Sequence, residues 1–140
     1  ISLPRSELVR LGGFREDFPA AAWEDIEFAY RAVGDGLRIH YQPQARTLHR
    51  QCSRPRTFCR RQRPSGRSAA IFAKLHPELD NFLGLHRSRR MTPLGRLRRS
   101  ALWLLVELGE RVDGIVPHRV YRDFLDLCYR EGLAEGLQGE

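Results

Sequence analysis

The chain has 140 residues, of which 41% are hydrophobic, so it is long enough for one domain with a modest core. Its 24 basic and 17 acidic side chains give a formal net charge of +7, which favours anionic partners. The longest apolar run, ALWLLV at residues 101–106, is far shorter than the roughly 20 residues of a membrane-spanning helix, so we expect that this chain does not cross a bilayer.

The positive charge is almost entirely arginine, because Lys74 is the one lysine in the sequence. A guanidinium group binds phosphate and carboxylate as a planar fork, so this bias is typical of proteins with anionic ligands. A high-GC genome would produce the same bias without any functional meaning, and both explanations stay open.

The cysteine content and the N-terminal residues favour a reducing, cytoplasmic compartment. Cys52, Cys59 and Cys128 are an odd number of thiols without a disulfide-framework spacing, which favours a reducing environment. No signal peptide is recognisable, so we expect a cytoplasmic protein. The chain opens on Ile1 within an extended-looking segment, and we expect that a preceding part of the protein has been removed.

The first part of the chain predicts two short helices. After the end of a strand, residues 4–11 form a helix that stops at Gly12 and Gly13. Residues 24–33 carry apolar side chains at spacings of three, four and seven, which is one helical face, and Gly34 ends this helix. Glu27 and Arg31, four residues apart, are expected to form a surface ion pair.

The middle of the chain predicts strands and a basic loop. Residues 37–42 alternate between apolar and polar side chains, as a half-buried strand does, and residues 45–49 indicate a second short strand. Residues 46–67 contain eight arginines and no acid, interrupted by prolines and a glycine, which predicts a basic loop. This loop leads into a helix over residues 68–76.

From about residue 93 the pattern changes to two long amphipathic helices, over residues 93–112 and 117–137. The segment between the two patterns suggests a boundary. We therefore expect an α/β part over residues 1–90 and an amphipathic helical tail over residues 91–140.

Two acidic residues at the start of the second predicted helix are the main candidates for chemistry. Glu24 and Asp25 follow Trp23 directly. One interpretation is that the helix dipole simply favours acids there, by about 0.3–1 kcal/mol each. The other is a sugar-binding entrance, in which the indole covers the C–H surface of a sugar and the carboxylates bind its hydroxyl groups.

Three runs carry a resemblance to a known family: SLPRSELVRLGGFREDF, WEDIEFAYRAVGDGLRIHYQPQARTLH and RRQRPSGRSAAIFAKLHPEL. Over about residues 1–80 the chain resembles the C-terminal, acceptor-side half of the catalytic domain of family 2 glycosyltransferases. The resemblance implies an α/β fold, a partial GT-A-like (Rossmann-like) half followed by the helical tail. It also implies transfer of a sugar from a nucleotide-sugar donor to an acceptor hydroxyl with inversion.

The resemblance also implies roles for residues of the acceptor side. Asp25 matches the catalytic base, and Glu24 matches the preceding acid that helps to hold the acceptor. Trp23 would be the platform for the sugar, although an aromatic core residue is an equal alternative. Gly12 and Gly13 match a loop that borders the acceptor pocket, and their alternative is a plain helix-stop turn.

Residues of the diphosphate side come from the same resemblance. His49 matches a histidine that coordinates a divalent cation, Mg²⁺ or Mn²⁺, on the donor diphosphate. Arg60, Arg61 and Gln62 match a mobile loop near the diphosphate or the acceptor, and their alternative is a solvated basic loop.

The sequence departs from the family in one respect: it contains neither an Asp-x-Asp motif nor a nucleotide-binding half. We therefore expect the N-terminal half of the same enzyme as the missing partner, and no turnover by this chain alone. The expected acceptor is a glycan or a lipid-linked sugar, as in the synthesis of cell-envelope polysaccharide.

Two binding functions compete with this one. A small basic module could bind nucleic acid or a membrane surface through residues 46–67, but Phe58 is the one aromatic residue there and no nucleic-acid-binding motif occurs, so we expect no nucleic acid partner. The leucine- and arginine-rich helix at residues 94–108 could instead lie on an anionic membrane, at the inner face of the cytoplasmic membrane. Packing of the same leucines inside the protein is the alternative.

Overall fold

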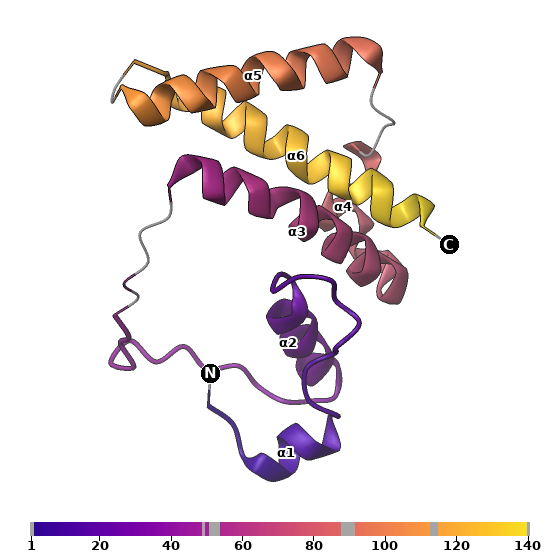
Figure 1. Cartoon of the computed structure of the whole chain (residues 1–140). Coiled ribbons are helices and arrows are strands. Elements are labelled where there is room, and N and C mark those ends of the chain that lie inside the picture. Colours follow the sequence, from indigo (N-terminus) through magenta and orange to yellow (C-terminus); the bar gives the residue numbers. More distant parts are fainter. Residues whose placement is uncertain (1, 49, 51–53, 88–91, 113–114, 140) are drawn as a thin grey trace.

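The computed structural model describes residues 2–48, 50, 54–87, 92–112 and 115–139 (Figure 1). Its elements are helical throughout: α1 (Arg5–Arg10), α2 (Glu24–Gly34), α3 (Pro55–Leu75), the 3₁₀ turn η1 (Pro77–Leu79), α4 (Asp80–Leu83), the 3₁₀ turn η2 (Leu85–Arg87), α5 (Pro93–Arg111) and α6 (His118–Gln138). Among these described helices, none is both long enough and apolar enough to cross a membrane.

The predicted α/β fold is wrong, because the described residues contain no strand and no sheet. Residues 37–42 run as irregular chain, and the side chains of Ile39 and Tyr41 are 66% and 89% exposed. A strand requires a neighbouring strand to receive its backbone hydrogen bonds, and no other described segment offers one. The predicted second strand ends on His49, which lies outside the described residues.

The predicted basic loop is also wrong over most of its length, because α3 begins at Pro55 and continues to Leu75. A proline fits the first turn of a helix, where its missing N–H has no partner to lose. Pro64 stands inside the same helix. The helix tolerates it because one face is buried along its length: Cys59, Gly66, Ser68, Ala69, Ala70, Phe72 and Ala73.

The three long helices form a bundle, with α3 and α6 side by side in the same direction and α5 antiparallel to α6 (Figure 1). Glycine residues permit the closest approach between α3 and α6. A Cβ atom on Gly132 would lie 1.8 Å from the carbonyl oxygen of Arg63, and one on Gly66 would lie 2.1 Å from that of Tyr129. The α6 backbone therefore lies directly against the α3 backbone.

Two apolar clusters fill the bundle. The central cluster lies between α3, α4 and α6, and its buried members are Ala69, Ala70, Phe72, Ala73, Leu83 and Leu133. The tail cluster joins α3, α5 and α6, and its buried members are Cys59, Val106, Phe124 and Cys128. The helical tail thus packs directly on α3, while α1 and α2 lie on the other side of α3 (Figure 1).

Candidate functional site

The candidate site begins where α2 begins. Trp23 is the residue before the helix, and its φ of 75° places it in the left-handed region, the single such non-glycine residue of the described chain. Its half-buried indole packs on the central cluster, with ring centroids 6.1 Å from Phe72 and 6.4 Å from Tyr129. A left-handed residue with a side chain costs about 1–2 kcal/mol, so the packing of the indole has to offset that cost.

The two acids that follow occupy different environments. The carboxylate of Asp25 is exposed, and its Oδ1 accepts a hydrogen bond of 2.9 Å from the backbone N–H of Ile26. Glu24 is half-buried, and its Oε2 is shielded from solvent without a hydrogen-bond partner among the described residues. A shielded carboxylate oxygen without a hydrogen-bond donor is uncommon in folded proteins, and such an unsatisfied group can mark a functional site.

Directly behind these acids lies a buried ion pair. The carboxylate of Glu27 is 1% exposed and accepts hydrogen bonds from Arg31 Nε at 2.9 Å and Nη2 at 3.0 Å. His76, at the end of α3, brings its Nε2 within 3.4 Å of the same carboxylate. The expected pair is therefore confirmed, but its expected surface position is wrong, because His76 and α3 cover it.

Arg31 also fixes the glycine corner that the sequence singled out. Its guanidinium donates hydrogen bonds to the carbonyl oxygen of Leu11 and, at 2.9 Å, to that of Gly13. Gly12 and Gly13 have φ angles of 76° and 69°, which favour glycine, so the helix-stop geometry is observed. The corner borders an open hollow of about 440 Å³ with Arg15, Glu16 and Asp17.

A cavity of about 420 Å³ brings Trp23 together with Gln62 of α3. Its other walls come from α4, α6 and the turn after α4: Phe82, Leu83, Gly84, Arg122, Leu125, Asp126, Tyr129 and Arg130. Neither Glu24 nor Asp25 lines it. The resemblance grouped Gln62 with Arg60 and Arg61, but only Gln62 reaches this cavity, while Arg61 is exposed.

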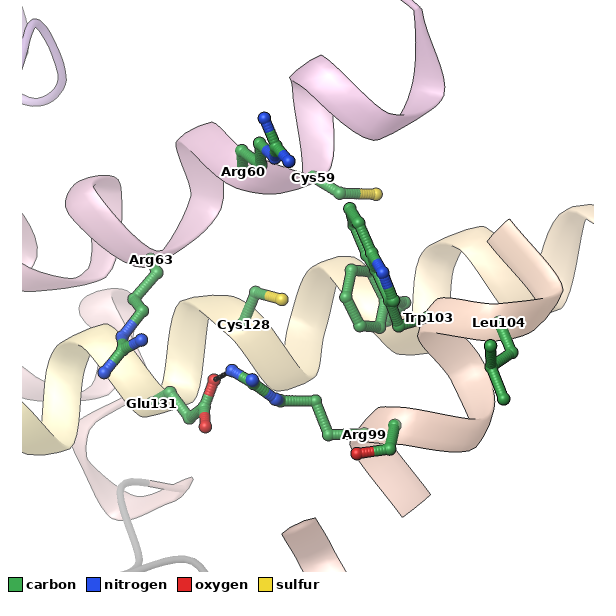
Figure 2. A pocket seen from close by; sticks show the side chains of 10 residues that line it. Cys59, Arg60, Arg63, Arg99, Trp103, Leu104, Cys128 and Glu131 are labelled. Carbon is green, nitrogen blue, oxygen red and sulfur yellow. Dashed lines mark hydrogen bonds and ion pairs between the residues drawn. The ribbon is translucent and has the colours of Figure 1, made fainter. Parts of the chain in front are cut away.

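Arg60 lies at a different cavity, between α3, α5 and α6. Its guanidinium stands 5.8 Å from the ring centroid of Trp103, and the volume beside it is about 470 Å³ (Figure 2). Trp103 and Glu131 of this cavity are residues that the sequence analysis did not single out, whereas Arg99 belongs to the arginine-rich helix that it expected at an anionic membrane. The four-residue spacing of Arg99 and Trp103 on one helix face was the available signal.

Several arginines of the predicted basic loop form ion pairs with acidic side chains of α5 and α6. Arg56 pairs with Glu107 at 3.1 Å, while Arg63 and Arg67 both bind the carboxylate of Glu135. These pairs leave fewer cations for phosphate groups than the sequence suggested, which weakens the interpretation as a nucleic-acid-binding module.

The predicted cation site stays a prediction. His49, its expected ligand, lies outside the described residues. Within the described ranges, no group of three or more His, Cys, Asp or Glu side chains could hold a metal ion. The described residues therefore do not by themselves provide a ligand set for Mg²⁺ or Mn²⁺.

Comparison with known proteins identifies no relative of this chain. The chain matches no protein-family model, no curated protein and no solved structure.

Proposed function

We propose that Trp23, Glu24 and Asp25 form the acceptor-binding part of an inverting, family 2-type glycosyltransferase, with Asp25 as the general base. One observation carries the proposal. The only left-handed non-glycine residue of the described chain directly precedes an exposed carboxylate and a shielded carboxylate oxygen without a partner. Backbone strain of this kind concentrates at functional sites.

The residues suit the chemistry of sugar transfer. The exposed carboxylate of Asp25 can take the proton of an acceptor hydroxyl as its oxygen attacks the anomeric carbon of a nucleotide sugar. The bond between that carbon and the diphosphate oxygen breaks, and its electron pair leaves with the nucleoside diphosphate. Attack opposite the leaving group inverts the anomeric centre. The carboxylate of Glu24 would help to hold the acceptor by accepting a hydrogen bond from a second hydroxyl group.

In this proposal a nucleotide-binding half outside the 140 residues holds the donor, because the sequence has no Asp-x-Asp motif. The divalent cation would bind together with that donor, and a loss of sugar transfer after addition of a chelator would show that it is required. We also propose a cytoplasmic site of action on a glycan or lipid-linked acceptor. The free thiols of Cys59 and Cys128 support a reducing compartment.

The test is sugar transfer by the full-length protein that contains this chain, with a panel of nucleotide sugars, before and after Asp25→Asn. We expect kcat to fall at least about 100-fold, since removal of a general base typically costs 10²–10⁴-fold. Asp35→Asn is the matched control: it removes the same charge at the other end of α2, where Asp35 pairs with Arg10 at the surface. Its kcat should stay within about twofold.

A variant with Asn at position 25 that retains more than about a tenth of the wild-type kcat would overturn the role of Asp25. Glu24→Gln separates binding from chemistry, because it should raise KM for the acceptor more than it lowers kcat. Circular dichroism of each variant confirms that the helices are intact.

A further inference from the structure

A cavity between α3, α5 and α6 has the size and composition of a small-molecule site. Its volume is about 470 Å³, within the range of about 300–1,000 Å³ typical of ligand pockets. Figure 2 shows the side chains of Arg60 and Arg63 from α3, Cys128 and Glu131 from α6, and Arg99 and Trp103 from α5 around it.

One side of this cavity is apolar. Trp103 packs against Phe124, with ring centroids 5.6 Å apart, and the thiols of Cys59 and Cys128 lie beside them. Burial raises the pKa of Cys59 to about 11 and that of Cys128 to about 12, so both thiols stay neutral at physiological pH. This side therefore suits a hydrocarbon group.

The other side is cationic. Arg99 pairs with Glu131 at 3.2 Å, and Arg63 pairs with Glu135, which leaves part of each guanidinium's donors available. Arg60 contacts the Trp103 ring and has no carboxylate partner among the described residues. Glu131 and Glu135 neutralise two of the three arginines that line the cavity, so an excess of one positive charge remains, at Arg60. An anionic group such as phosphate would complete this side.

The cavity continues onto an exposed apolar face of α5. Leu104 lines the cavity and is 68% exposed, and Leu97 and Leu94 are 68% and 75% exposed on the same helix. These leucines belong to the stripe that the sequence analysis predicted, and they do not pack inside the protein. Arg96 and Arg98 are exposed beside them. An alkyl chain that leaves the cavity would therefore find an apolar path with basic side chains at its edge.

We propose that this cavity binds a membrane lipid with a phosphate head group. The phosphate lies between Arg60 and Arg99, and the start of the hydrocarbon chain passes Trp103 and Leu104 onto the apolar face of α5. A nucleotide fits less well, because the Trp103 ring already contacts Arg56, Arg60 and Phe124 and has little free surface for a stacked base. This site is separate from Asp25, and its test does not depend on the proposed transferase activity.

The experiment is isothermal titration calorimetry of the full chain with dihexanoyl phosphatidic acid, at lipid concentrations where it stays monomeric. We expect saturable binding with one site. Arg60→Gln should weaken it at least tenfold, because Arg60 is the guanidinium without a carboxylate partner. Arg119→Gln, an exposed residue of α6 that does not line the cavity, removes the same charge and should change Kd less than twofold.

A second pair of variants tests the hydrocarbon path. Leu104→Ser should weaken binding of dihexanoyl phosphatidic acid about three- to tenfold. Val9→Ser, which replaces a 65% exposed residue of α1, should have no effect. Because both side chains are largely exposed, neither change threatens the fold, and thermal melts of the variants verify this.

The remaining measurements distinguish a lipid phosphate from a free phosphate ion and from a membrane surface. Inorganic phosphate that binds as tightly as dihexanoyl phosphatidic acid would show a plain anion site and overturn the lipid proposal. Binding to phosphatidic acid vesicles without binding of the monomeric lipid would show only surface attraction and would also overturn it. Equal weakening by Arg60→Gln and Arg119→Gln would point to net charge and lead to the same conclusion. Phosphatidylcholine vesicles should not sediment the protein.

Discussion

Glu27 and Arg31, one turn apart in α2, form a bidentate ion pair whose carboxylate is 1% exposed and whose guanidinium also holds the carbonyl oxygens of Leu11 and Gly13. A single arginine therefore joins the glycine corner to the helix that presents Glu24 and Asp25. The pair positions the candidate site without belonging to it.

The first prediction concerns how Glu27→Gln changes the stability of the protein at neutral and at acidic pH. Burial alone would raise the pKa of Glu27, but hydrogen bonds from Arg31 and His76 outweigh it and hold the pKa below its ordinary value of 4.5. The ionised carboxylate therefore stabilises the fold above about pH 4.5, and this contribution is lost as the pH falls through the lowered pKa. Removing one partner of a buried ion pair typically costs about 3–5 kcal/mol of stability. For Glu27→Gln at pH 7 we expect the free energy of unfolding to fall by an amount at the lower end of this range.

Urea unfolding at pH 7 and at several values down to pH 3 measures this. The free energy of unfolding of Glu27→Gln should fall less on acidification than that of the wild type. Glu16→Gln changes an exposed acid without an ion-pair partner among the described residues, and should follow the wild-type pH dependence. Parallel pH dependences for Glu27→Gln and wild type would contradict the assigned pKa direction.

The second prediction is that Arg31→Lys loosens the glycine corner. A lysine ammonium cannot bind the Glu27 carboxylate in two places and two backbone carbonyls at once, because it lacks the planar fork of arginine. Amide hydrogen exchange at residues 11–14 should become faster by about tenfold or more, with exchange in α5 and α6 unchanged. If the corner exchanges at the wild-type rate, Arg31 does not hold it.

The third prediction concerns the contact between α3 and α6. Gly132→Ala would place a Cβ atom 1.8 Å from the carbonyl oxygen of Arg63, so the two backbones have to separate. Forcing extra atoms into a packed core typically costs about 1–3 kcal/mol, and a backbone contact should place this change at the upper end or beyond. Thermal denaturation measures the loss.

Gly34→Ala is its control, because no atom lies within 4 Å of the added Cβ atom at that position of α2. It should leave the stability unchanged or raise it by up to about 1 kcal/mol, since alanine loses less backbone entropy than glycine. Equal effects of the two substitutions would contradict the close approach of α3 and α6.

The fourth prediction concerns the thiols. Since burial raises the pKa of Cys59 to about 11 and that of Cys128 to about 12, hardly any reactive thiolate is present at pH 7.4. Iodoacetamide should label neither residue in the native protein within an hour and both after denaturation in urea. A Cys52→Ser background simplifies counting by mass spectrometry. Rapid native labelling of Cys128 would show that α5 opens away from α6.

The sequence by itself determined those helices whose apolar face can be recognised from the residue spacing within one segment. The predicted helices over residues 24–33, 93–112 and 117–137 are confirmed as Glu24–Gly34, Pro93–Arg111 and His118–Gln138. A helix forms its hydrogen bonds within one segment, so its 3.6-residue periodicity is readable from that segment alone. The same holds for the glycine corner after α1, whose left-handed backbone angles favour glycine.

The tertiary structure decided what depends on distant partners. Residues 37–42 have the alternation of a strand and yet form none, because a strand needs a neighbour that no other described segment provides. The arginine-rich segment before residue 68 became helical because α5 and α6 cover Cys59 and bind Arg56 and Arg63. Glu27 became a buried charge because α3 and His76, which is 49 residues away in sequence, pack over it, and local spacing contains no information about such a contact.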